Sequence, residues 1–222
     1  MLTRREMLAA GGAALVGSAV PARAGGLSFP QVDAELMGRA KAAFARQRRS
    51  IGNARSMVVV DYARASSEER FYLVDSASGW VSAFHVAHGR GSDPGHTGYL
   101  HRFSNDLGSE ASSAGGYVFA EAYDGRNGRS IRLEGLDRSN SNARARNIVV
   151  HAAPYAEPAA LARLGKLGRS EGCFAVSNLT LQAVLEQLRP GTFLYCGRSA
   201  PLVFPNRPGQ SALLMPPAAR GH

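Results

Sequence analysis

The sequence predicts a mostly β fold of the β-sandwich type, with one N-terminal helix and short helices in the last third of the chain. Short runs rich in β-branched and aromatic residues recur, separated by small or turn-forming residues. The runs cover residues 57–62, 70–75, 79–84, 117–123, 130–134, 147–152 and 192–196. Apolar residues at helical spacing are confined to a stretch near the N terminus and two short stretches after residue 156. The pattern favours one β-rich domain.

The first 24 residues have the pattern of an export signal. Arg4 and Arg5 precede an apolar run from Leu8 to Val20, and an A-x-A cleavage pattern ends at Ala24. We therefore predict a twin-arginine signal peptide over residues 1–24, cleaved after Ala24, and a periplasmic mature protein. An ordinary amphipathic helix is the alternative. The apolar run is about a dozen residues, too short for a membrane span, and no later segment is long and apolar enough.

The length and the net charge of the chain limit the size of the domain and the kinds of partner that it can bind. The chain of 222 residues carries a formal net charge of +9. Residues 1–24 hold three arginines and one glutamate, so cleavage leaves 198 residues (222 minus 24) and a charge of about +7 (9 minus 3 plus 1). A basic exported domain suits an anionic envelope polymer. The arginines are scattered and not interleaved with aromatic residues, so we expect no nucleic-acid partner.

The mature chain divides into three parts. We assign residues 25–56 to an N-terminal helical segment, residues 57–200 to a β-rich domain and residues 201–222 to a proline-rich tail, extended or mobile. Leu36, Ala40, Ala43 and Phe44 recur at helical spacing and predict a helix over residues 33–49. Asp33 can cap its N terminus. We expect this helix to pack on the β domain as a support.

The first strands of the β domain follow in order. After the strand at 57–62, runs 70–75 and 79–84 predict a hairpin joined by the small residues 76–78. Residues 88–115 are rich in Gly, Ser, Asp and Asn and predict a long irregular excursion, a kind of loop that is often functional. Runs 117–123 and 130–134 predict a second hairpin, with its turn at Asp124-Gly125.

The last third of the chain alternates strands and helices. The apolar run 147–152 predicts a buried strand. Pro158 suits the first turn of a short helix that Gly165 ends. Ser177 or Asn178 caps a helix over residues 179–188, and the run 192–196 predicts a final strand.

The two cysteines, Cys173 and Cys196, can form a disulfide in an oxidising compartment. The surroundings of Cys173 favour a second interpretation. It follows Gly172 in a loop of glycines and charged residues and comes before a helix, where backbone N–H groups can stabilise a thiolate. A nucleophilic thiol also needs a base, and His151 at the end of an apolar strand is the best candidate. A core histidine bonded to backbone groups is the alternative.

These residues resemble a known family. His151, followed by Ser170-x-Gly172-Cys173, resembles the signature of the YkuD-type L,D-transpeptidases. Segments 88–92, 103–105, 135–137, 146–155 and 168–175 resemble the murein L,D-transpeptidase catalytic domain branch, over roughly residues 57–197. Glu171 stands where many members carry histidine, and Ala175 where many carry arginine or asparagine.

The resemblance implies an L,D-transpeptidase, a cysteine acyltransferase that acts on the tetrapeptide stems of peptidoglycan. It implies that Cys173 is the nucleophile, that His151 is the base, and that Ser170 holds the histidine or the loop. The backbone N–H groups of Gly172 and Cys173 are then expected to stabilise the oxyanion. No metal and no organic cofactor is implied.

Two more residues are expected at the substrate. Arg169 can bind a substrate carboxylate, and a solvated surface arginine is the alternative. Tyr155 belongs to the resembling segment that follows His151 and is expected to contact the substrate.

Three alternatives stay open. Water in place of an acceptor amine gives an L,D-carboxypeptidase acting on the same stems. A non-catalytic envelope-binding protein of the same fold would have an unreactive or oxidised Cys173. A metalloenzyme could use the four histidines that lie close together in sequence, although no HExxH motif occurs. These are His85, His88, His96 and His101.

Overall fold

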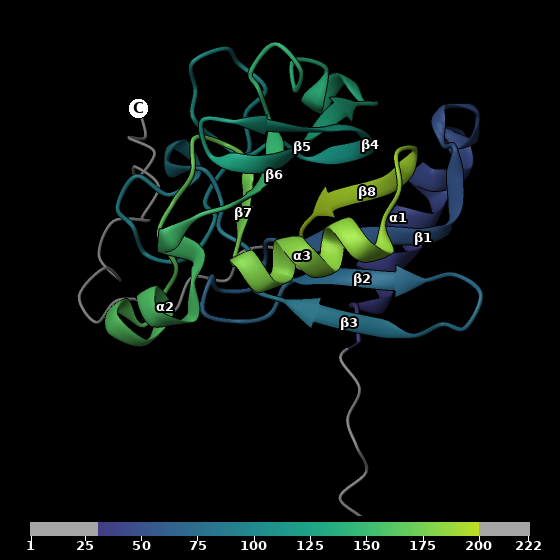
Figure 1. Ribbon diagram of the computed structural model, residues 1–222. Coiled ribbons are helices and arrows are strands. Elements are labelled where there is room, and N and C mark those ends of the chain that lie inside the picture. Colours follow the sequence, from purple (N-terminus) through teal and green to yellow (C-terminus); the bar gives the residue numbers. More distant parts are fainter. Residues whose placement is uncertain (1–30, 200–222) are drawn as a thin grey trace, which may run out of the picture.

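The computed structural model describes residues 31–199 (Figure 1). The predicted signal peptide (1–24) and the tail (201–222) lie outside the described residues. The α-helices are α1 (Ala34–Arg46), α2 (Pro158–Leu164) and α3 (Asn178–Gln187). The strands are β1 (Asn53–Asp61), β2 (Phe71–Asp75), β3 (Val81–Phe84), β4 (Gly115–Gly125), β5 (Gly128–Gly135), β6 (Val149–Ala152), β7 (Phe174–Val176) and β8 (Thr192–Gly197).

The strands form one eight-stranded sheet in the order β3-β2-β1-β8-β4-β5-β6-β7. Neighbours pair antiparallel except β1 with β8 and β6 with β7, which are parallel. The segment after β3 reaches the opposite edge of the sheet, at β7. There Ala87 forms a β-bridge with Ala175, and Gly89 forms one with Ser170. The sheet therefore curls until its two edges almost meet. The predicted mostly β fold is confirmed, with the two layers built from one curled sheet.

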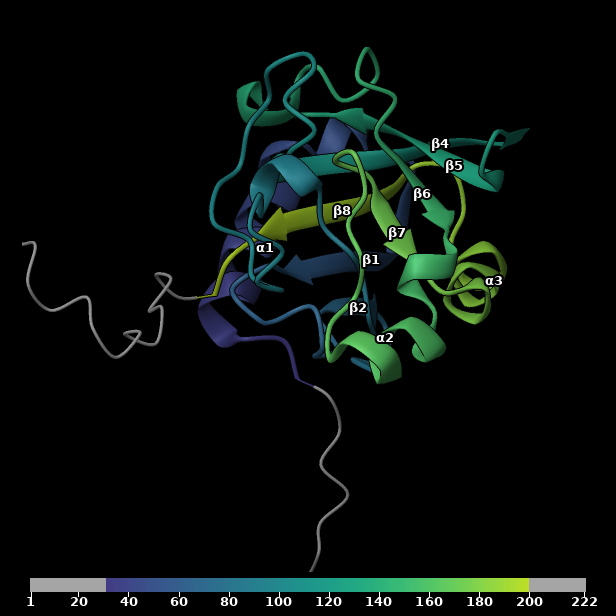
Figure 2. The ribbon, with the colours of Figure 1, turned by 90° about the vertical axis from the view of Figure 1, so that its left-hand side faces the viewer.

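The two faces of β1 pack against different helices. On the inner face, Val58 belongs to the main core together with Leu181 and Val184 of α3. On the outer face, Val59 packs in a second cluster that includes Leu36 of α1. Figures 1 and 2 show α1 and α3 on opposite sides of these strands. The alternation of side chains along a strand produces this division.

The predicted N-terminal helix is present and packs on the sheet. Asp33 caps it, since its Oδ1 accepts a hydrogen bond from the Leu36 N–H (2.9 Å). Leu36, Ala40 and Ala43 are buried against β1, β2 and β8. The apolar stripe thus turns toward the β strands, as the helical spacing predicted.

The turn of the β4–β5 hairpin differs from the predicted one. Asp124 and Gly125 belong to β4, and the turn lies at Arg126 and Asn127. Gly128 follows with a φ of +73°, a left-handed conformation that glycine adopts without strain. The left-handed residue after a two-residue turn, and not the Asp-Gly pair, therefore sets the register.

The long excursion between β3 and β4 is irregular, as predicted, and lies against the loop before Cys173. The Arg90 N–H donates to the Ser170 carbonyl (2.7 Å), and the Ser170 N–H donates to the His88 carbonyl (2.9 Å). The strand β7 is absent from the sequence-based prediction, because three residues are too few to show alternation. Among the described residues, no helix has the length and apolar character needed to cross a membrane.

Candidate active site

The pairing of β6 with β7 brings His151 and Cys173 to the same face of the sheet. Val150 pairs with Phe174, and both side chains lie in the main core. Because side chains alternate along a strand, His151 and Cys173 point to the opposite face. Both line one groove of about 530 Å³. Figure 2 shows the two strands side by side next to the loops that complete this site.

Five of the six residues predicted for the site line this groove: Cys173, His151, Ser170, Arg169 and Tyr155. The sixth, Gly172, lies in the loop just before the cysteine. The rest of the lining consists of Arg90, Arg126, Asn127, Ala152, Ala153, Pro154 and Glu171. Their roles in catalysis and binding stay predictions, but the fold gathers residues from distant segments into one groove.

The imidazole of His151 is held in one tautomer. Its Nδ1 lies 2.8 Å from the carbonyl oxygen of Ala152, which can only accept a hydrogen bond. The proton therefore sits on Nδ1, and Nε2 keeps its lone pair. Burial lowers the pKa of His151, and the bond to Ala152 opposes this shift. His151 is thus a neutral imidazole near pH 7, able to accept a proton at Nε2.

The thiol of Cys173 is half-buried and protonated at rest. Burial raises its pKa to about 11, the Val149 N–H and Arg146 oppose the shift, and Glu171 adds to it. The Sγ–H donates to the carbonyl oxygen of Asn147 (3.4 Å). With thiol and imidazole both neutral, no thiolate is present beforehand, and any attack by the sulfur would require its proton to be removed during the step.

Ser170 holds the loop and not the histidine. Its Oγ donates to the carbonyl oxygen of Cys173 (2.7 Å) and accepts from the Gly172 N–H (3.2 Å). One hydroxyl thereby binds the backbone of both Gly172 and Cys173. The group that orients His151 is the backbone carbonyl of Ala152, which sequence reasoning missed because a carbonyl leaves no signature in residue type.

Gly172 adopts a conformation that other residues reach only under strain, with a φ of +110°. A Cβ there would lie 2.7 Å from the carbonyl oxygen of Ala111 and 2.9 Å from Cδ1 of Ile148. The glycine before the cysteine is therefore required both by its backbone angle and by lack of space.

The expected oxyanion donors are not equivalent. The Gly172 N–H already donates to Ser170 Oγ. The Cys173 N–H lies just before the paired residues of β6 and β7, whose register starts at Val150 and Phe174. The Gly172 N–H would have to leave Ser170 to act as an oxyanion donor.

Arg169 and Tyr155 are positioned by their own contacts. Arg169 Nη1 donates to the carbonyl oxygens of Asp93 and Pro94 (3.0 Å to the latter), which leaves other guanidinium N–H groups at the groove. Tyr155 packs closely on the loop, since a Cβ at Gly168 would lie 2.5 Å from the Tyr155 Cβ. Both side chains line the groove, as a role in binding requires.

Arg146 is a residue whose role the sequence did not predict, although it belongs to the resembling motif. Its guanidinium donates to the carbonyl oxygens of Ser104 (2.9 Å) and Ala111 and to Ser113 Oγ (2.6 Å). These bonds hold the excursion after β3 against the segment that leads into β6. Its charge also lowers the pKa of Cys173.

A chain of buried polar side chains, Arg70, His88 and Asp93, lies behind the loop that precedes Cys173. Arg70 is fully buried, and its Nη2 lies 2.8 Å from His88 Nδ1. Because arginine can only donate, Nδ1 accepts, and Nε2–H faces Asp93 Oδ2 at 3.3 Å. Burial lowers the pKa of His88 to about 4. The His88 carbonyl accepts from the Ser170 N–H, so this chain ends at the catalytic loop.

The four clustered histidines each contact protein groups, and two of them share one carboxylate: His88 Nε2 lies 3.3 Å from Asp93 Oδ2 and His101 Nε2 lies 3.5 Å from Asp93 Oδ1. His85 contacts the Ser67 carbonyl, His96 contacts the Leu167 carbonyl, and His88 lies between Arg70 and Asp93. Over residues 31–199, no three His, Cys, Asp or Glu side chains are arranged to hold a metal ion.

Both cysteines are free. Cys196 is fully buried in β8, and burial raises its pKa strongly. In the strand order, β4, β5 and β6 lie between β8 and β7, the strand that Cys173 precedes. The fold thus places the two sulfurs on separate strands, with Cys196 in the core and Cys173 at the groove.

Comparison with known proteins identifies the family of the chain. A family model for the L,D-transpeptidase catalytic domain matches residues 29–196. No curated protein matches the sequence. Among solved structures, the chain is similar to an L,D-transpeptidase from Mycobacterium smegmatis, with 13% identity and a TM-score of 0.39 over 64% of this chain and 58% of that one. It is also similar to L,D-transpeptidase 3 from Mycobacterium tuberculosis in complex with a faropenem-derived adduct, with 14% identity and a TM-score of 0.40 over 65% of this chain and 60% of that one. The chain spans about three fifths of the length of these two proteins.

Proposed function

The chain belongs to the L,D-transpeptidase catalytic domain family, and from that premise we propose that it is an exported cysteine acyltransferase acting on peptidoglycan stem peptides. The observation that carries the proposal is the shared groove, in which a half-buried thiol and an imidazole with a free Nε2 lie on one face of β6 and β7. Export to the periplasm by the twin-arginine pathway belongs to the same proposal.

The reaction begins with proton transfer. His151 Nε2 accepts the proton of Cys173 as the sulfur attacks the carbonyl carbon between the third stem residue and its terminal D-alanine. The developing oxyanion takes a hydrogen bond from the Cys173 N–H. His151 then gives its proton to the departing amine, D-alanine leaves, and the stem stays bound to sulfur as a thioester.

The charges of the groove suit such a substrate. Stem peptides carry carboxylates, and three arginines line the groove: Arg90, Arg126 and Arg169. Arg90 is engaged by Glu110 and Glu171, the latter at 3.2 Å. Arg126 and Arg169 have no ion-pair partner over residues 31–199, so their charges are available to substrate carboxylates.

The acceptor decides the outcome of the second half of the reaction. An amine of a neighbouring stem that attacks the thioester gives a cross-link, and His151 takes its proton. Water gives a shortened stem, which is the carboxypeptidase alternative.

The test is incubation of the mature protein with purified sacculi rich in tetrapeptide stems, followed by digestion and mass analysis of the muropeptides. We expect cross-links formed through the third stem residue, with tripeptide stems instead if water is the acceptor. A folded Cys173→Ser variant should give neither. The absence of both products with the wild-type protein would favour the non-catalytic envelope-binding alternative.

A further inference from the structure

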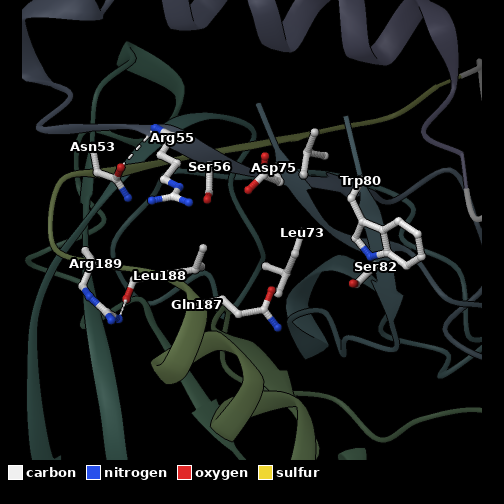
Figure 3. A pocket seen from close by; sticks show the side chains of 11 residues that line it. Asn53, Arg55, Ser56, Leu73, Asp75, Trp80, Ser82, Gln187, Leu188 and Arg189 are labelled. Carbon is white, nitrogen blue, oxygen red and sulfur yellow. Dashed lines mark hydrogen bonds between the residues drawn. The ribbon is translucent and has the colours of Figure 1, made fainter. Parts of the chain in front are cut away.

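A second cavity, of about 340 Å³, lies where the sheet extends beyond the end of α3 (Figure 3). Strands β1, β2 and β3 form its floor through Ser56, Leu73, Asp75 and Ser82, and the end of α3 forms its wall. It shares no lining residue with the groove of Cys173. We call it the Trp80 cavity after its largest side chain.

The end of α3 explains why this cavity exists and why it is polar. Leu181, Val184 and Leu188 cover the inner face of the sheet as part of the main core. The helix ends at Gln187, and beyond this point the same face of the strands carries small polar side chains in place of apolar ones. The sequence therefore keeps this end of the face open and hydrated.

Trp80 is the only tryptophan of the chain, and its side chain is unusually exposed at 57%. Figure 3 shows its indole at one end of the cavity beside Ser82. The turn that carries it is held firmly, because Asp75 Oδ1 accepts from the N–H groups of Ala77 (2.9 Å) and Ser78 (2.8 Å). The Asp75 N–H also donates to the Trp80 carbonyl (2.9 Å). The backbone that carries the ring is thus fixed, and the exposed indole offers a flat apolar face.

The other side chains supply both donors and acceptors. In the described part of the chain, the side chains of Arg55 and Gln187 form no hydrogen bond with protein groups, and both point into the cavity in Figure 3. Hydrogen bonds from Ser78 and Ala77 lower the pKa of Asp75, which is therefore a charged acceptor. Arg189 donates to carbonyls at the end of α3 and so is held at the opposite end of the cavity from Trp80.

We propose that the Trp80 cavity binds a short stretch of an N-acetylated glycan, with one sugar ring stacked on Trp80. A flat aromatic face suits the C–H face of a pyranose, and mixed amide, carboxylate and guanidinium groups suit hydroxyls that both donate and accept. Leu73 and Leu188 provide apolar surface for an acetamido methyl group. The choice of this sugar class rests on the proposed function, since the glycan strands of peptidoglycan carry the stem peptides.

The positions of the two sites are compatible with one polymeric substrate. The helix α3 begins two residues after β7 ends, and its C-terminal end forms the wall of the Trp80 cavity. Its ten residues span about 15 Å. A glycan held at Trp80 would therefore keep its stems close to Cys173 without occupying the catalytic groove.

The first test uses the tryptophan fluorescence of the mature protein, excited selectively over its tyrosines, which reports on Trp80 alone because the chain has one tryptophan. Titration with the β-1,4-linked tetramer of N-acetylglucosamine should give a saturable change in emission. Maltotetraose, which lacks acetamido groups, should give none. No saturable change with the N-acetylated tetramer, or an equal response to maltotetraose, would overturn the inference.

Calorimetry with variants locates the site. Trp80→Ala should lower the association constant about tenfold or more, and Gln187→Leu should lower it severalfold. Leu107→Ala is the matched control, because Leu107 is also an exposed apolar side chain (67%) but lies outside the cavity, and it should bind as the wild type does. Equal binding by Trp80→Ala would overturn the inference.

A third readout separates this inference from the proposed function. Trp80→Ala should react with an acylating reagent at Cys173 at the wild-type rate. Sugar binding without any acyl transfer by the wild-type protein would contradict the proposed function alone, and acyl transfer without sugar binding would overturn the glycan site alone.

Discussion

The imidazole of His151 is oriented by the carbonyl of the next residue, Ala152, at 2.8 Å from Nδ1. This contact leaves Nε2 free to take a proton and requires no acidic third residue. Burial keeps the imidazole neutral by lowering its pKa, and the bond to Ala152 only partly opposes that effect. Under the proposed function, the neutral histidine and the neutral thiol of the groove would become charged only during the reaction.

The raised pKa of Cys173, about 11, predicts slow alkylation at neutral pH. The rate of reaction with iodoacetamide should keep rising above pH 9, whereas an ordinary cysteine, with a pKa near 8.5, levels off there. Labelling rates measured by mass spectrometry between pH 6 and 10.5 test this. A plateau reached by pH 8 would show that the thiolate is already stable in the groove.

Glu171 contributes to that high pKa even though Arg90 pairs with it at 3.2 Å. Glu171→Gln removes the negative charge and should raise the labelling rate at pH 8 about two- to fivefold. Glu186→Gln is the matched control, since this exposed glutamate does not line the groove. Equal rates for wild type and Glu171→Gln would mean that solvent and Arg90 fully screen the charge.

Ser170 is expected to matter through its hydroxyl alone. Ser170→Ala removes the bonds to the Cys173 carbonyl and the Gly172 N–H, at a cost of about 1–3 kcal/mol in loop order. Acylation of Cys173 should slow about tenfold or more while circular dichroism stays native. Ser170→Thr keeps the hydroxyl and should recover most of the rate. Failure of threonine to exceed alanine would contradict this account.

Gly172 and Gly108 form a matched pair for the role of space around the nucleophile. Both have a positive φ, but an added Cβ meets backbone at Gly172 and nothing within 4 Å at Gly108. Gly108→Ala should lower the free energy of unfolding by about 1 kcal/mol, and Gly172→Ala by about 3 kcal/mol or more. Chemical denaturation measures both. Similar losses would show that the loop before Cys173 relaxes easily.

Much of this architecture could be predicted from the sequence because its signals are local. Asp33, Pro158, Gly165 and Ser177 bound the helices where expected, and the strand runs show clear alternation. The partnership of His151 with Cys173 was proposed from the place of His151 at the end of an apolar strand and from the glycine-flanked loop of Cys173, and the resemblance to a family supported it. The turn of the β4–β5 hairpin was predicted wrongly, because Asp-Gly competes with the left-handed Gly128.

The features that the sequence could not predict are tertiary contacts between residues that lie far apart in the chain. Arg70 reads as an ordinary polar residue ahead of a strand, yet it is fully buried because carbonyls and His88 surround it. Arg146 donates to three residues of the excursion after β3, which only the fold brings next to it. The backbone carbonyls of Ala152 and Asn147 carry no residue signature at all.

The buried His88 predicts a loss of stability in acid. Its folded-state pKa of about 4 lies below the ordinary 6.5, so below pH 6.5 the unfolded chain binds a proton that the folded chain refuses. Stability should therefore fall by about 3 kcal/mol as the pH drops from 6.5 to 4 and stay flat with respect to this group above 6.5. His151, whose pKa is also lowered, acts in the same direction.

Urea denaturation at a series of pH values measures this slope. His88→Gln should remove most of it, whatever its effect on stability at pH 8, because the neighbours Arg70 and Asp93 stay charged across this range. His85→Gln should keep the wild-type slope. A His88→Gln protein with an unchanged slope would show that the acid sensitivity arises elsewhere.

The most direct test of the central claim is the intact mass of the protein after incubation with a carbapenem, whose strained ring is an acyl donor for an activated cysteine. The account predicts one covalent adduct, mapped to Cys173, absent from Cys173→Ser and formed at least about a hundredfold more slowly by His151→Ala. A folded wild-type protein that forms no adduct, or a His151→Ala variant that reacts at the wild-type rate, would contradict it.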